Sequence, residues 1–168
     1  MNELVEACEK VDLEKIKYSV EHGADIHDNN DYFLRRAAEK GYLEEVKYLV
    51  ENGANIHADN DVPLRFAAYK RHFKIVKYLI EKGANIHANN DYALRETAEN
   101  NHLEIVKYLV EKGANIHVYN DDALRLAVYR GHLEVVNYLR EIANKKWKCF
   151  NCIVRATCLK LCEGWNKK

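Results

Sequence analysis

The sequence predicts an all-α solenoid in which helix-turn-helix units stack side by side and are joined by short loops. The first observation is a strict repeat, because glycines recur every 30 residues at Gly23, Gly53, Gly83 and Gly113. A fixed period between about 20 and 50 residues is typical of stacked repeat arrays. The second is composition: 48% of the residues are hydrophobic and only one is proline, which favours helices around an extended core.

Residues 61–90 show the expected unit most clearly. Asp61 suits the N-cap of a first helix, since its carboxylate can accept the free amide hydrogens of the first turn. Leu64, Ala67 and Ala68 then recur at helical spacing, and their mostly small side chains allow close approach to neighbouring helices. The first helix should be short and should break near Arg71.

The second helix of the unit has the apolar stripe of a half-buried helix. Its apolar side chains are Phe73, Val76, Leu79 and Ile80. Gly83 should end it, because glycine adopts a left-handed C-cap at least cost. The following residues 84–90 contain Ile86 and several asparagines, a composition that favours a loop or a minimal hairpin. One such unit buries too little apolar surface to offset the entropy of ordering its backbone, so units must stack.

Three stretches resemble the ankyrin repeat. They are Leu-x-x-Ala-Ala at 64–68, Leu-x-x-x-Gly-Ala-Asn-Ile at 79–86 and Gly-His-Leu-Glu-Val-Val at 131–136. The resemblance covers residues 3–142, and the sequence of the repeats is similar to that of ankyrin proteins abundant in giant DNA viruses. The unit has 30 residues instead of the family's usual number of about 33, which predicts shortened hairpins. The family's Thr-Pro-Leu-His becomes Val62-Pro63-Leu64-Arg65, so the hydrogen bonds of that His are not carried over.

The resemblance divides the chain into an array over residues 1–142 and a cysteine-rich tail over residues 143–168. The five expected units are an N-terminal cap at 1–30 and then 31–60, 61–90, 91–120 and 121–142. Cys8 occupies the small-residue position of Ala38, Ala68 and Ala98, which indicates packing in the core. Ankyrin repeats place a left-handed residue between the paired helices, and the chain has Gly41, Arg71, Asn101 and Gly131 there.

The tail contains four cysteines whose spacing admits several interpretations. They are Cys149, Cys152, Cys158 and Cys162. The first pair has zinc-knuckle spacing, but the second pair follows far sooner than the roughly 15 to 20 residues of common two-knuckle sites. Read as a helix, the tail presents one apolar stripe that could cap the last unit, which is the favoured interpretation. Zinc binding, a disulfide and redox sensing remain as alternatives.

Three further residue types recur with the repeat and are interpreted as structural. His27, His57, His87 and His117 lie too far apart on successive units to share one metal ion, and each should hydrogen-bond an adjacent loop. The second type is an arginine four residues after an aspartate, a spacing that predicts an ion-pair ladder or alternatively a phosphate-binding strip. The third type is a tyrosine that is expected to cover the edge of the stack while its hydroxyl stays exposed to solvent. These are Arg35, Arg65, Arg95 and Arg125, and Tyr18, Tyr48, Tyr78, Tyr108 and Tyr138. His72, His102 and His132 stand where the family motif also has His, and a structural role is favoured.

Positions at which the internal copies differ are the candidates for function, because stacking constrains the positions that are the same in every unit. One such set lies near the end of the first helices, where ankyrin proteins line a concave groove that binds partner proteins. The set comprises Arg36, Glu39, Lys40, Phe66, Tyr69, Lys70, Glu96, Glu99, Leu126, Tyr129 and Arg130. Its apolar members Phe66, Tyr69, Leu126 and Tyr129 would be the anchors, since aromatic residues are enriched at interface hot spots. Drift on a solvated face is the alternative.

These observations favour a non-catalytic scaffold that binds a protein partner and is itself monomeric. The sequence has no phosphate loop, nucleophile elbow or His-Glu-x-x-His pair, so neither enzyme activity nor a cofactor or metal is expected. The balance of 26 basic and 26 acidic residues argues against nucleic acid, and the absence of a long apolar run argues against a membrane span. An intracellular location, cytoplasmic or nuclear and possibly in a host cell, is expected. The alternatives are a self-associating structural protein and an adaptor with a metal-bound tail.

Overall fold

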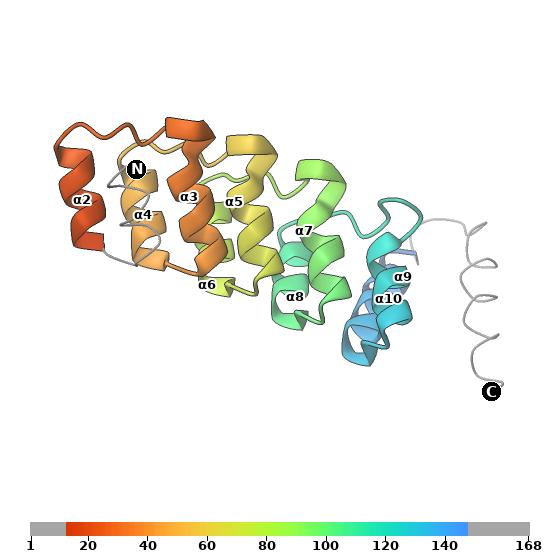
Figure 1. Ribbon diagram of the computed structural model, residues 1–168. Helices are drawn as coiled ribbons and strands as arrows, with labels where there is room; N and C mark the ends of the chain where they lie inside the picture. Colours follow the sequence, from red (N-terminus) through yellow and green to blue (C-terminus); the bar gives the residue numbers. More distant parts are fainter. Residues whose placement is uncertain (1–12, 148–168) are drawn as a thin grey trace.

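The computed structural model describes residues 13–147, and within that range it contains helices and no strands. Five helices are second helices of their units: α2 (Leu13–Glu21), α4 (Leu43–Glu51), α6 (Phe73–Glu81), α8 (Leu103–Glu111) and α10 (Leu133–Trp147). The first helices are α3 (Asp28–Lys40), α5 (Ala58–Tyr69), α7 (Ala88–Glu99) and α9 (Asp122–Arg130). Figure 1 shows the units following one another in a single direction from α2 to α10. The predicted all-α solenoid is confirmed.

The core is one continuous strip that runs between the two rows of helices. Equivalent side chains of successive units, such as Leu64 and Leu94, are no more than 1% exposed and belong to the same apolar cluster. The first helices stack on one another more closely than the second helices do. Small buried residues, for example Ala67 and Ala68, permit this approach. The first helices therefore form the shorter, inner side of the array.

The turn between paired helices has the left-handed backbone that the sequence predicts. The φ angles are 89° at Gly41, 65° at Arg71, 60° at Asn101 and 76° at Gly131. At Gly41 a side chain would also collide with its neighbour, because an added Cβ would lie 2.6 Å from the ring of His72. Arg71 has the same backbone without glycine's freedom, so it is a strained position.

The loops that join units close as left-handed turns instead of the short hairpins that were expected. Three consecutive residues with positive φ lie within the first turn of α3, α5 and α7 and just before α9, and those of α5 are Asp59, Asn60 and Asp61 with φ of 51°, 60° and 57°. Asn and Asp tolerate this region better than other residues with a β-carbon, although a run of three is unusual. The tight turn is how a 30-residue unit connects its helices with fewer residues than the family's usual unit.

The repeated aspartate ties the start of each first helix to the loop that follows the second helix of the same unit, and its predicted role as an N-cap is wrong. No side chain caps the first helices at Asp61 or at the preceding His57. Instead the buried Asp61 carboxylate accepts the backbone N–H of Asn85, in the loop that leads from α6 to the next unit, at 2.8 Å. The same oxygen accepts a hydrogen bond from Nδ1 of His57 at 3.0 Å. Equivalent amide contacts join Asp31 to Asn55 and Asp91 to Asn115.

The repeated arginines also bind differently from the predicted ladder of Asp and Arg four residues apart. Arg35 donates to the carbonyls of Asn29 and Asn30, at 2.8 and 3.0 Å, and so ties the left-handed turn to its helix. Its ion pair is with Asp59 at the start of α5, at 3.8 Å. Arg35 does not pair with Asp31, because that carboxylate already accepts hydrogen bonds from the backbone N–H of Asn55 and the imidazole of His27.

The second-helix histidines hold the first helix of the preceding unit. Ring nitrogens of His72 and His132 donate to the carbonyls of Glu39 and Glu99 at 2.9 and 2.8 Å, and His102 donates to Ala68 at 3.1 Å. The structural interpretation of these histidines is therefore confirmed.

The second-helix tyrosines pack as predicted, but two of their hydroxyl groups are not exposed to solvent. Within the described residues the hydroxyls of Tyr78 and Tyr108 are buried without a hydrogen-bond partner, and burial raises the pKa of both side chains. Tyr108 packs edge-on against Phe73 of the preceding unit, with ring centroids 5.5 Å apart. This contact between second helices places the hydroxyl inside the stack.

The ends of the predicted architecture lie partly outside the described residues. Cys8 and the four tail cysteines belong to the stretches 1–12 and 148–168, which are not described. The predicted boundary between array and tail at 142/143 falls inside α10, which continues to Trp147. The helix continues because Ala143 stands where the other units have the glycine that ends the second helix.

Candidate partner-binding surface

The variable positions predicted from the sequence lie at the carboxyl ends of the first helices. We call them together the first-helix surface. They are Arg36, Glu39 and Lys40 at the end of α3; Phe66, Tyr69 and Lys70 at the end of α5; Glu96 and Glu99 on α7; and Leu126, Tyr129 and Arg130 on α9. Because the first helices form the inner side of the array, these positions share one face.

Three aromatic side chains of the first-helix surface are exposed to solvent. The exposed fractions are 37% for Phe66, 42% for Tyr69 and 77% for Tyr129. Phe66 and Tyr69 are three residues apart on α5 and therefore neighbours on its surface. Leu126 is half-buried, so it offers a partner less apolar area than the other predicted anchors.

The charged members of the surface pair with one another in some units. Arg36 and Glu39 form an ion pair at 2.6 Å within α3. Glu99 on α7 pairs with Arg130 on α9, also at 2.6 Å, and so links two units. This contact is the main cause of the raised pKa of the exposed Arg130 guanidinium.

The surface of α5 differs from its neighbours because it combines aromatic and unpaired basic side chains. Lys70 Nζ lies 4.9 Å from the ring centre of Tyr69, a cation–π contact. The following residues Arg71 and Lys74 are exposed and enter no ion pair within residues 13–147.

Sequence reasoning did not include Lys74 or Leu133 in a binding surface. Leu133 is 71% exposed although its counterparts Leu43 and Leu103 pack against the core. The signal was available, since Leu133 begins the second helix of the last unit that keeps the regular spacing.

The described residues show no arrangement suited to metal binding or to crossing a bilayer. Between residues 13 and 147 no three His, Cys, Asp or Glu side chains gather as a metal site would require. Over the same stretch no helix combines the length and apolar character of a membrane span. The imidazoles of His57 and His87 are each hydrogen-bonded to the aspartate four residues later, Asp61 and Asp91.

Comparison with known families gives one match, which extends over most of the chain. A family model described as ankyrin repeats, three copies, matches residues 4–90 and again residues 87–148. No curated protein matches the chain significantly.

Proposed function

Because the chain belongs to the ankyrin repeat family, whose members generally mediate protein–protein interactions, we propose that it binds a partner protein through the first-helix surface. The observation that carries this proposal is the contrast between the two kinds of position in the repeat. Core positions such as Leu64 and Leu94 are the same and are buried in both units. The positions of Phe66 and Glu96 differ between the same two units and lie on the inner side of the array.

The exposed aromatic residues supply the binding energy in this proposal. Burying a Phe or Tyr side chain on association is worth about 1.5–3 kcal/mol before the entropic cost of association is subtracted. Phe66, Tyr69 and Tyr129 are exposed enough to gain area from a partner. The ion pair between Glu99 and Arg130 lies between the two aromatic sites and fixes the relative position of α7 and α9.

Replacement of Phe66, Tyr69 and Tyr129 together by alanine tests the proposal. Partner capture by the immobilised chain should be lost, while helical circular dichroism should stay nearly unchanged because the three side chains are exposed. The matched control replaces Lys77, Lys107 and Asn137, three exposed second-helix residues spaced 30 apart, by alanine. Capture should survive in this control. Equal capture by both variants would show that the site lies elsewhere.

Ankyrin repeat proteins are generally non-enzymatic scaffolds, and we propose the same for this chain. The sequence of the repeats resembles that of ankyrin proteins of giant DNA viruses, which supports the proposal of a viral protein that acts inside a host cell. A self-associating structural role is the second candidate, and the exposed Leu133 at the end of the array is the observation that favours it. Sedimentation equilibrium over a range of concentrations separates the two, because a monomeric scaffold keeps one mass and a self-associating chain does not.

A further inference from the structure

The third unit of the array carries a concentration of positive charge between two acidic units. Residues 61–90 contain six basic and two acidic side chains, a net charge of +4 with His neutral. Residues 31–60 contain four basic and six acidic side chains, and residues 91–120 three and five, so each neighbour carries −2. The balanced charge of the whole chain therefore conceals a local basic site.

Arg65 differs from the equivalent arginines of the array in having no polar partner. Arg35 and Arg95 each donate to the left-handed turn and pair with an acid at the start of the next first helix, Asp59 or Asp122. Within residues 13–147 Arg65 makes neither contact, and its Nε is buried without a hydrogen bond. The sequence explains the difference, because Asn89 and Tyr92 stand at the positions equivalent to Asp59 and Asp122.

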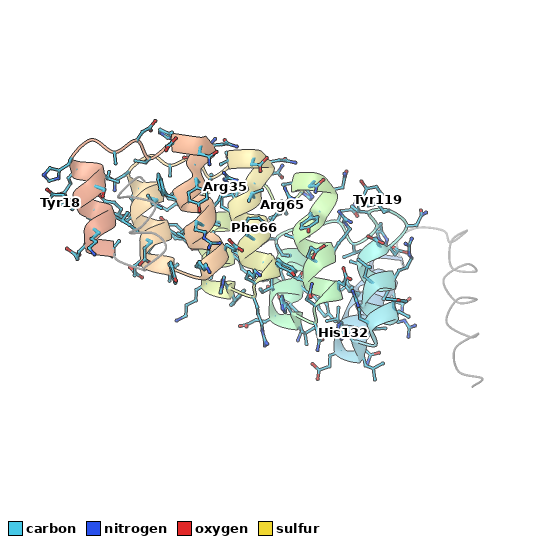
Figure 2. The ribbon with its side chains drawn as sticks, in the orientation of Figure 1. Tyr18, Arg35, Arg65, Phe66, Tyr119 and His132 are labelled. Atoms are coloured by element: carbon cyan, nitrogen blue, oxygen red, sulfur yellow. The ribbon has the colours of Figure 1, made fainter. Side chains whose placement is uncertain are left out.

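The guanidinium of Arg65 is nevertheless held in place by stacking. Its Cζ lies 4.6 Å from the ring centre of Tyr92, whose other neighbour is Arg95 at 5.5 Å. A stacked guanidinium loses less freedom when it binds than a mobile one, and its planar fork matches a carboxylate. In Figure 2 Arg35 and Arg65 on the first helices and Tyr119 in the loop before α9 follow one another along the array, with Phe66 next to Arg65. Arg65 is thus a positioned cation beside an exposed aromatic side chain.

Helical spacing joins Arg65 to the aromatic residues and lysine of α5. Arg65 and Tyr69 are four residues apart, as are Phe66 and Lys70, so the four side chains form a contiguous patch in which cations flank two rings. Lys70 and the following Arg71 enter no ion pair within the described part of the chain. We call Arg65, Phe66, Tyr69, Lys70 and Arg71 the basic-aromatic patch.

We propose that the basic-aromatic patch binds an acidic segment of the protein partner, in which an Asp or Glu carboxylate pairs with Arg65 and a nearby apolar side chain packs on Phe66 and Tyr69. This inference rests on the function proposed above and adds the chemistry of the partner. A charge-assisted bidentate pair gives geometric specificity, and the adjacent rings give the apolar area.

The extent of the positive charge favours an acidic peptide over a nucleic acid. Stacked helices are about 8–10 Å apart, so one basic unit spans the length of about three extended residues at about 3.3 Å each. A nucleic acid gains its affinity from several successive phosphates. Here the acidic units on either side would repel a longer polyanion, whereas a short acidic segment fits between them.

Selection from a random library of peptides tests the inference with the full chain as bait. Peptides of about twelve residues can cross about four units when extended. The selected sequences should be enriched in Asp or Glu within a few residues of an aromatic or aliphatic residue. Binding of these peptides should weaken with rising salt concentration, because exposed charge pairs are screened.

Two double variants with the same change in net charge locate the contact. Arg65→Gln with Lys70→Gln should weaken binding of the selected peptides about tenfold or more, as expected for loss of a charged hydrogen bond. Lys77→Gln with Lys82→Gln removes two charges from the second-helix side of the same unit and should change binding less than about twofold. Equal weakening by the two variants would overturn the assignment to Arg65 and Lys70.

The remaining outcomes distinguish failure of this inference from failure of the proposed function. Selection of basic or uncharged peptides that lose binding in the alanine variant of Phe66, Tyr69 and Tyr129 would overturn the acidic partner but leave the first-helix surface as the site. Peptides unaffected by that variant would overturn both proposals, and failure to enrich any peptide would count against the patch as a peptide site. Tighter binding of single-stranded oligothymidine than of the peptides, lost on the same charge substitutions, would replace the acidic peptide by a nucleic acid.

Discussion

Replacement of Asp61 by alanine should loosen the loop that connects unit three to unit four. The variant loses the hydrogen bond that the buried carboxylate accepts from Asn85 N–H at 2.8 Å, which leaves that amide without its partner. A hydrogen bond to a charged group contributes about 1.5–3 kcal/mol. Alanine also tolerates the φ of 57° at this position less well than aspartate, which adds about 1 kcal/mol. The contact with His57 adds little, since that side chain is 54% exposed.

These contributions add to a loss of about 2.5–4 kcal/mol in the free energy of unfolding. For a chain of this size the melting temperature should fall by roughly 5–15 °C. Thermal unfolding followed by circular dichroism measures the fall, and urea unfolding gives the free energy.

Asp121→Ala provides the matched control for the Asp61 variant. Asp121 has a similar φ of 60° and its own histidine contact, but no backbone N–H of a following loop donates to it in the described part of the chain. The two variants should therefore differ chiefly by the value of the amide contact, about 1.5–3 kcal/mol. Equal destabilisation of the two would refute the claim that the aspartate works by holding the loop after the second helix.

Three further substitutions test other parts of the account. Arg71→Gly should raise the free energy of unfolding in urea by up to about 1 kcal/mol, because glycine relieves the strain of the left-handed backbone at φ 65°. The greater freedom of glycine in the unfolded chain offsets part of this gain. A lower stability would contradict the strain at this position. Tyr108→Phe should be neutral or stabilising by up to about 1 kcal/mol in the same assay, since it removes a buried hydroxyl without a partner; a clear loss would show that the hydroxyl is satisfied. Burial lowers the pKa of His102 in the folded protein, so the unfolded chain binds a proton at this histidine more readily. The stability that this residue contributes is therefore fully present above the unfolded pKa of about 6.5 and should be lost as the pH falls below that value. His102→Gln should reduce that slope in urea unfolding measured at several pH values, and an unchanged slope would contradict the assignment.

The repeated helices could be predicted from the sequence because their causes lie within one unit. The apolar stripe and Gly83 as the stop follow from local spacing and backbone preference, whereas the left-handed turn at Arg71 was expected from the resemblance to ankyrin repeats. The left-handed turn at 59–61 could not be predicted in the same way. It places three residues with β-carbons in an unfavourable region, and the contact that secures it comes from Asn85, 24 residues away.

The sequence shows which first-helix positions differ between units, but not how their side chains pair. Differences between internal copies pick out Glu99 and Arg130, but their ion pair joins residues 31 positions apart on different helices. Arg65 was assigned to a uniform arginine ladder from its spacing. Its lack of a polar partner depends on Asn89 and Tyr92 at the start of α7, and its stacking on Tyr92 requires the assembled array.

Hydrogen–deuterium exchange of the full chain, with and without a bound partner protein, tests the central claim most directly. Binding to the first-helix surface should slow exchange in α5 and in the turn after it at Lys70 and Arg71, and more weakly at the end of α9. The outer helices α6 and α8 should keep their rates, apart from a uniform shift caused by the added stability of the complex. Protection concentrated on α6 and α8, with α5 and α9 unchanged, would contradict recognition by the first helices.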